Sequence, residues 1–216
     1  MRFAAWVVGG SAVATVLIAF AGWALRDDPG KYFGEKKPGT LLSAGLLLAS
    51  AWTCRLVHHL PAAALFGRFW IVQASLFLFL AVDELFRVHE RLDRLVHYLL
   101  GLNDRHPVTD HLDDAIIGLY ALVAAWLWFR HRALLIRLPW MVLTMAPAFA
   151  AFAAMLVLDV AGGSKAVEDG LKIVSCALIF AGFAAAQRQL AEAADDPIAC
   201  GLSSLSRRVA CDPEGA

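Results

Sequence analysis

The chain has 216 residues, of which 60% are hydrophobic and 18% are charged, and its formal net charge is zero. This composition departs from that of soluble domains in the direction of membrane proteins, so we expect an all-α protein, a polytopic membrane helix bundle with the lipid bilayer as its partner. No block of basic residues is present, which excludes nucleic acid as a partner. The sequence identifies no protein partner.

Apolar runs predict about six transmembrane helices, because about 20 residues are needed to cross roughly 30 Å of hydrocarbon. The six-helix transmembrane domain then covers residues 1–188, and residues 189–216 form a polar tail that we expect to be mobile and cytoplasmic. In chain order, the expected helices are 3–25, 39–60, 69–88, 113–129, 138–160 and 168–187.

The first apolar run has a second interpretation, as a cleaved signal peptide. Arg2 precedes the run, and Ala19-Phe20-Ala21 resembles a cleavage site. The run is nevertheless longer than a usual signal core, and Trp6 and Trp23 stand near its ends, where interfacial aromatic residues are found. We therefore favour a first helix that is retained.

The arginines favour an orientation in the membrane. Short loops that carry Arg usually face the cytoplasm. With both termini inside a bacterial inner (plasma) membrane, Arg55, Arg68, Arg130 and Arg188 share the cytoplasmic side, although the lysines within residues 31–37 oppose this assignment. We expect both termini in the cytoplasm.

This topology brings acidic residues of three helices to one face, at the outer leaflet. The apolar runs next to these acids are too short to cross a bilayer, so we expect the acids to lie inside the membrane edge. Ionisable groups at that depth are functional candidates by default. The acids are Asp83 and Glu84 at the end of the third helix, Asp113 and Asp114 before the fourth, and Glu168 and Asp169 before the sixth.

The stretch from Asp83 onward predicts one straight helix with charged side chains on defined stripes. At about 100° per residue, Asp83, Arg87, Glu90 and Arg94 share a stripe, which favours ion pairs between residues four apart. His89 opens a neighbouring stripe. A metal site would need His89 with Asp93 or Glu90, completed from another helix, since imidazole and carboxylate together suit zinc, iron or manganese.

Capping is an alternative explanation for the acids that open the fourth and sixth helices. Acidic side chains in a first turn complement the helix dipole and bind free N–H groups. Capping does not explain why these acids are expected at the same membrane depth and on the same membrane face as Asp83. It also does not explain why Lys172 lies one turn after Glu168. We expect Lys172 to neutralise a neighbouring carboxylate inside the bundle.

Two motifs resemble a family of uncharacterised bacterial multi-pass inner-membrane proteins. One is Asp83-Glu84, four residues, then His89-Glu90; the other is Glu168-Asp169-Gly170-Leu171-Lys172, which opens the final helix. The resemblance covers roughly residues 69–188 and implies fold and location, but no activity. It differs at Lys172, where the resemblance implies a third acid.

Two classes of function fit these residues. The first hypothesis is a metal- or proton-dependent membrane enzyme acting on a lipid-like substrate at the outer leaflet. The second is a non-catalytic bundle whose polar cluster is structural or passes an ion or proton. In the first hypothesis the catalytic residues are Asp83, Glu84 and Glu90, and the ligands of zinc, iron or manganese are His89, Glu90, Glu168 and Asp169.

Overall fold

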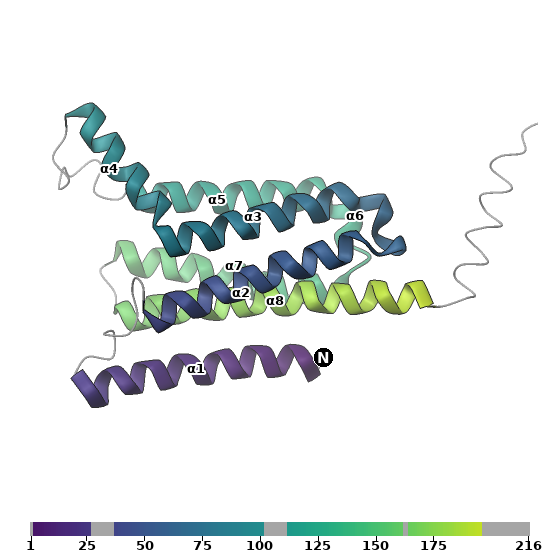
Figure 1. Cartoon of the computed structure of the whole chain (residues 1–216), viewed down its shortest axis with the longest axis horizontal. Coiled ribbons are helices and arrows are strands. Elements are labelled where there is room, and N and C mark those ends of the chain that lie inside the picture. The colour runs from purple at the N-terminus through teal and green to yellow at the C-terminus, as the bar shows by residue number, and fades with distance from the viewer. Residues whose placement is uncertain (1, 27–36, 102–111, 162–163, 196–216) are drawn as a thin grey trace, which may run out of the picture.

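The computed structural model describes residues 2–26, 37–101, 112–161 and 164–195, and every regular element in these residues is helical. The predicted all-α fold class is therefore confirmed. Figure 1 shows long helices lying side by side, with α4 turned away from them. The elements are α1 (Arg2–Arg26), α2 (Pro38–His58), the 3-10 helix η1 (Pro61–Phe66), α3 (Gly67–Phe86), α4 (Val88–Leu100), α5 (Leu112–Arg130), α6 (Arg132–Leu135), α7 (Pro139–Val160) and α8 (Lys165–Asp195).

The apolar helices fit a membrane protein. Within the described residues, four segments are long and apolar enough to cross a membrane, and two further apolar helices are shorter. The third span is longer than its apolar run predicts, because η1 extends it at the start. The four segments are Pro38–His58, Pro61–Phe86, Pro139–Asp159 and Lys165–Ala193, and the shorter helices are Trp6–Ala21 and Ala115–Arg130.

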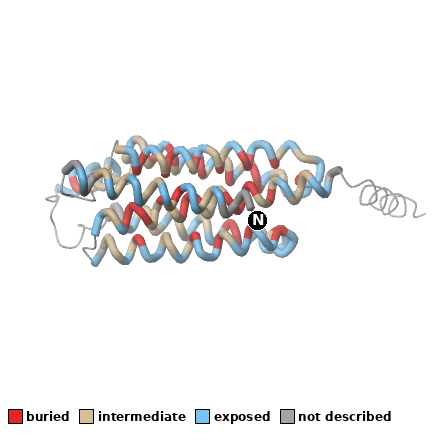
Figure 2. Tube along the Cα trace, turned by 90° about the horizontal axis from the view of Figure 1, so that it is seen from below, coloured by how far each residue is buried: buried red, intermediate tan, exposed pale blue. Residues whose placement is uncertain are grey.

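Helix α8 lies at the centre of the bundle and contacts α1, α2 and α7. Glycines allow two of these close approaches, as small residues commonly do between membrane helices. A Cβ atom on Gly182 would collide with the side chain of Thr144 in α7, and one on Gly170 would lie 3.3 Å from Cγ2 of Thr15 in α1. Figure 2 shows the buried residues in the interior between the helices, and exposed residues along their outer sides.

Aromatic side chains fill one half of the bundle. The ring of Phe183 in α8 meets Phe77 and Trp70 of α3 edge to face, with ring centroids 5.0 and 6.0 Å apart. Trp128, near the end of α5, also contacts Phe183, at 6.3 Å. Edge-to-face pairs of this kind add to the free energy gained from burial alone. These aromatic contacts therefore lie in the half of the bundle away from the acids of α3 and α8.

Two predicted boundaries are wrong. The third helix does not continue straight through Arg87, where the backbone becomes left-handed and separates α3 from α4. The last helix does not end at Gln187 but continues to Asp195, so residues 189–195 of the expected tail are helical. The side chain of Gln189 donates a hydrogen bond to the carbonyl of Arg137, 3.1 Å away. Residues 196–216 lie outside the described residues.

Candidate functional site

The break between α3 and α4 creates the first part of the site. Arg87 has φ 57° and ψ 51°, and its N–H donates to the carbonyl of Asp83, which closes α3. A residue with a Cβ atom pays a penalty in this conformation, so other contacts must stabilise it. The guanidinium of Arg87 forms an ion pair with Glu90, with Nε 2.8 Å from Oε1. The structure thus pairs Glu90 with Arg87, three residues before it, whereas the sequence predicted that Glu90 pairs with Arg94 on one straight helix.

The same break places His89 against Asp83. Oδ1 of Asp83 accepts a hydrogen bond from the backbone N–H of His89, and Oδ2 lies 2.8 Å from its ring Nδ1. The Asp83 and His89 side chains are 8% and 16% exposed. An ionised carboxylate only accepts hydrogen bonds, so beside it Nδ1 is the donor, and in the neutral imidazole Nε2 is then left as an acceptor. Asp83 thus caps the start of α4 and orients an imidazole at once.

A second network joins three helices beside this pair. Oε1 of Glu84 in α3 accepts hydrogen bonds from the Ser43 hydroxyl of α2, at 2.8 Å, and from Nζ of Lys172 in α8, at 2.9 Å. Nζ of Lys172 also lies 3.1 Å from Oδ1 of Asp169. The prediction that Lys172 neutralises a carboxylate inside the bundle is confirmed. Partners are needed here because an unpaired charge in the low-dielectric interior is costly.

The first turn of α8 contributes a further ion pair. Nζ of Lys165 lies 2.9 Å from Oε1 of Glu168. Glu168 is buried, with 8% of its surface exposed. Asp159, at the end of α7, lines the same region. The side chains of Asp113 and Asp114 lie outside the described residues.

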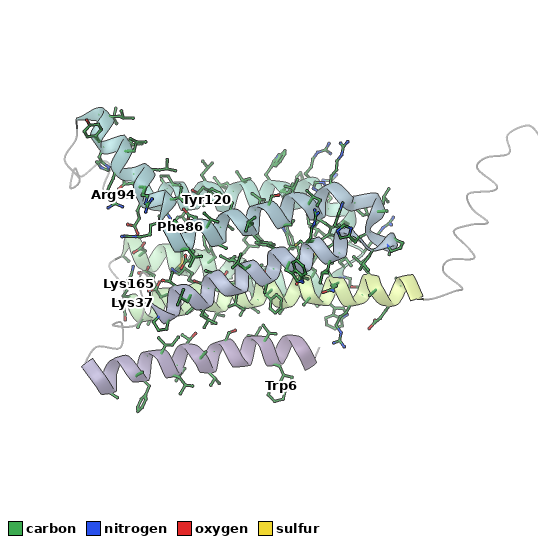
Figure 3. All side chains as sticks on the ribbon, viewed as in Figure 1. Trp6, Lys37, Phe86, Arg94, Tyr120 and Lys165 are labelled. Carbon is green, nitrogen blue, oxygen red and sulfur yellow. The ribbon has the colours of Figure 1, made fainter. Side chains whose placement is uncertain are left out.

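These groups line one end of a cavity of about 490 Å³ between the helices. The rest of the cavity is lined mostly by apolar side chains. Figure 3 labels Lys37 and Lys165 close together at the charged end, with Phe86 and Arg94 where α3 meets α4. The charged end is formed by Lys37, Asp83, Glu84, Arg87, His89, Glu90, Asp159, Lys165, Glu168, Asp169 and Lys172, and the apolar part includes Phe77, Leu80, Ile117, Trp128, Met145, Phe149, Phe152, Met155 and Ile179.

The cavity is elongated along the helices. On α3, its lining extends from Gln73 to Glu84, and eleven residues of helix rise about 16 Å. On α7 it extends from Met145 to Asp159, which is about 21 Å. A long apolar space with charged groups at one end fits a chain-like molecule that has a polar headgroup.

All six residues predicted for the site line this cavity: Asp83, Glu84, His89, Glu90, Glu168 and Asp169. Their catalytic and metal-binding roles stay predictions. Within the residues that the structure describes, no group of three His, Cys, Asp or Glu side chains could hold a metal ion. Each of three carboxylates instead has one oxygen paired with a lysine: Glu84, Glu168 and Asp169.

Sequence analysis missed two polar residues of the cavity wall. Tyr120 of α5 packs its ring against Phe79, at 5.3 Å, and its buried hydroxyl has no hydrogen-bond partner among the described residues. Gln73 of α3 is 2% exposed, and its Nε2 also lacks a partner in the described part of the chain. The available signal was a polar side chain within each apolar run.

Comparison with protein families finds a match that covers most of the chain. Residues 4–186 match a family described as a domain of unknown function (DUF8692). Comparisons with curated proteins and with solved structures give no match. The matched region includes every residue that lines the cavity.

Proposed function

We propose that this chain, which belongs to the DUF8692 family of unknown function, is an integral membrane enzyme that acts on the headgroup of a lipid-like substrate by general acid–base catalysis. The observation that carries the proposal is a single cavity with an acid–base pair, Asp83 and His89, at one end and an apolar length beyond it. The apolar length would hold the chain of the substrate, and the charged end its headgroup.

His89 is the general base in this proposal. Its Nδ1 is held by the Asp83 carboxylate, so Nε2 is free to accept a proton from a substrate group. Asp83 keeps its hydrogen bond with Nδ1 when the imidazolium forms, since both ring nitrogens are then donors. A histidine is suited to this task, since its ordinary pKa lies close to neutral pH.

We assign different roles to the other two carboxylates predicted to be catalytic. Glu84 is held by Ser43 and Lys172, and Glu90 by Arg87. In the proposal, Glu84 is a positioning residue that fixes α3 against α2 and α8, and Glu90 fixes the backbone turn that presents His89.

Metal-dependent chemistry would use His89, Glu90, Glu168 and Asp169 as ligands of zinc, iron or manganese. Three ion pairs oppose it, because a metal ion would compete for these oxygens with Arg87, Lys165 and Lys172. We therefore favour the proton-dependent mechanism. The arginines of the short loops support a location in the inner membrane, with the charged end of the cavity at the outer leaflet and both termini inside.

The second candidate function is a non-catalytic helix bundle in which the polar cluster only holds the helices together. The hydrogen bonds and ion pairs around Glu84 favour this candidate. Ser43, Glu84, Lys172 and Asp169 join three helices, as a purely structural cluster would. This candidate gives no reason for the long cavity beside the cluster.

An assay with mixed lipids tests the proposal. Protein reconstituted with a total membrane lipid extract of the expressing cells would be incubated and the lipids compared by mass spectrometry. We expect at least one species to be converted by the wild type and not by His89→Gln. Glu192→Gln, an exposed acid near the other end of α8, is the matched control and should retain conversion. Identical lipid profiles for the wild type and a folded His89→Gln protein would contradict the proposal.

A further inference from the structure

The charged end of the cavity contains a buried carboxylate oxygen that accepts no hydrogen bond from the described residues. Asp169 is 4% exposed and lines the cavity, and Lys172 binds its Oδ1. Its Oδ2 is buried and has no hydrogen-bond partner among the described residues. Buried polar atoms are almost always satisfied, so an orphaned oxygen on a cavity wall indicates a group that a bound molecule supplies.

The charge of this end also disfavours an anionic ligand. Among the residues that the structure describes, the lining includes six carboxylates against four lysines and arginines. Three of the four cations are already paired with carboxylates: Arg87 with Glu90, Lys165 with Glu168, and Lys172 with Glu84 and Asp169. The excess negative charge would therefore repel a phosphate or carboxylate headgroup. It would attract an ammonium group and would not repel a neutral hydroxyl group.

A second unpartnered group lies on the opposite wall. The hydroxyl of Tyr120 comes from α5, and its ring packs on Phe79, one turn before Asp83. A hydroxyl both donates and accepts, so Tyr120 fits a headgroup that also donates to Asp169. His89 also lines this cavity.

From these contacts we infer that the substrate is a long-chain molecule whose headgroup donates hydrogen bonds, a lipid-like amine or alcohol, with its headgroup on Asp169 Oδ2. The inference rests on the proposed function and adds the substrate class to it. Asp169 is then a binding residue for the headgroup. The apolar residues of α7, such as Phe152 and Met145, contact the chain of the substrate.

Photo-crosslinking with three matched probes tests this inference. Dodecylamine, dodecanol and dodecanoate, each with a diazirine at the chain end, would be irradiated with the purified full-length protein in detergent. Mass spectrometry would map the labelled residues. We expect the amine and the alcohol to label the apolar lining several-fold more than the carboxylate. Asp169→Asn should reduce the advantage of the amine several-fold, whereas Glu192→Gln should leave it unchanged.

The outcomes separate this inference from the proposed function. If no probe labels the cavity lining, the lipid-like cavity and the substrate class both fail. If the carboxylate labels as strongly as the amine and the alcohol, or more strongly, the substrate class is wrong and the lipid-binding cavity stands. If Asp169→Asn does not fold, the ranking of the three probes on the wild type decides alone.

Discussion

Asp83 holds His89 at two points: one carboxylate oxygen accepts the backbone N–H and the other lies 2.8 Å from ring Nδ1. The two residues stand on opposite sides of the break at Arg87, so the contact that starts α4 also orients the imidazole. The proposed base is therefore fixed by the fold itself, at the charged end of the cavity.

Removing the Asp83 carboxylate should destabilise the protein. Asp83→Ala deletes a helix cap and a hydrogen bond to the ring, and we expect a loss of about 1–3 kcal/mol in the free energy of unfolding. Asp83→Asn should lose less, because the amide oxygen still accepts from the N–H of His89. Unfolding of the purified protein in detergent measures both losses. Equal stability of Asp83→Ala and wild type would contradict this role.

Substitutions at Arg87 should separate backbone conformation from charge. Arg87→Gly removes the ion pair with Glu90 but favours the positive φ, so we expect a change within about 1 kcal/mol. Arg87→Pro should cost about 3 kcal/mol or more, because proline fixes a negative φ and removes the N–H that binds the Asp83 carbonyl. Unfolding experiments rank the two variants by their free energies of unfolding. A proline variant as stable as the glycine variant would exclude the left-handed backbone conformation at Arg87.

Hydropathy was sufficient to predict the helices but not this break. Apolar runs located the long helices because burial in lipid requires about 20 apolar residues in sequence. Arg87 carries no local signal, since the usual markers of a left-handed residue are glycine and asparagine. The turn depends instead on contacts with Asp83, His89 and Glu90, which form only once the chain has folded.

The Lys172 network predicts a non-additive pair of substitutions. Lys172→Met leaves the half-buried Glu84 and the buried Asp169 without their shared cation, and we expect a loss of about 3 kcal/mol in the free energy of unfolding. Combining it with Glu84→Gln should recover part of that loss, because one of the two uncompensated charges is then removed. The four unfolding free energies form a double-mutant cycle. Simple additivity would show that Lys172 and Glu84 are not paired.

The tight contact between α7 and α8 predicts a position-specific effect of one methyl group. Gly182→Ala places a Cβ against Thr144 and should lower the free energy of unfolding by about 1–3 kcal/mol. Gly118→Ala in α5 is the matched control, since nothing lies within 4 Å of its Cβ, and it should be neutral or stabilising. Both values come from unfolding in detergent. Equal effects at the two glycines would contradict the packing.

The carboxylates of the site could be predicted, but the cavity could not. Charged residues at the ends of apolar runs are visible in the sequence, and the cost of burying them marks them as candidates. Tyr120 and Gln73 gave no such signal, because a neutral polar residue in an apolar run is tolerated in many positions. Their importance comes from the space between α3, α5, α7 and α8, which depends on how the helices pack.

The tautomer of His89 tests the acid–base pair most directly. In protein with ¹⁵N-labelled histidine, the ring nitrogens of His89 can be assigned by comparison with His89→Gln. At a pH at which the ring is neutral, we predict a proton on Nδ1 and none on Nε2, and a change of this pattern in Asp83→Asn. A proton on Nε2 in the wild type, unchanged in Asp83→Asn, would contradict the account.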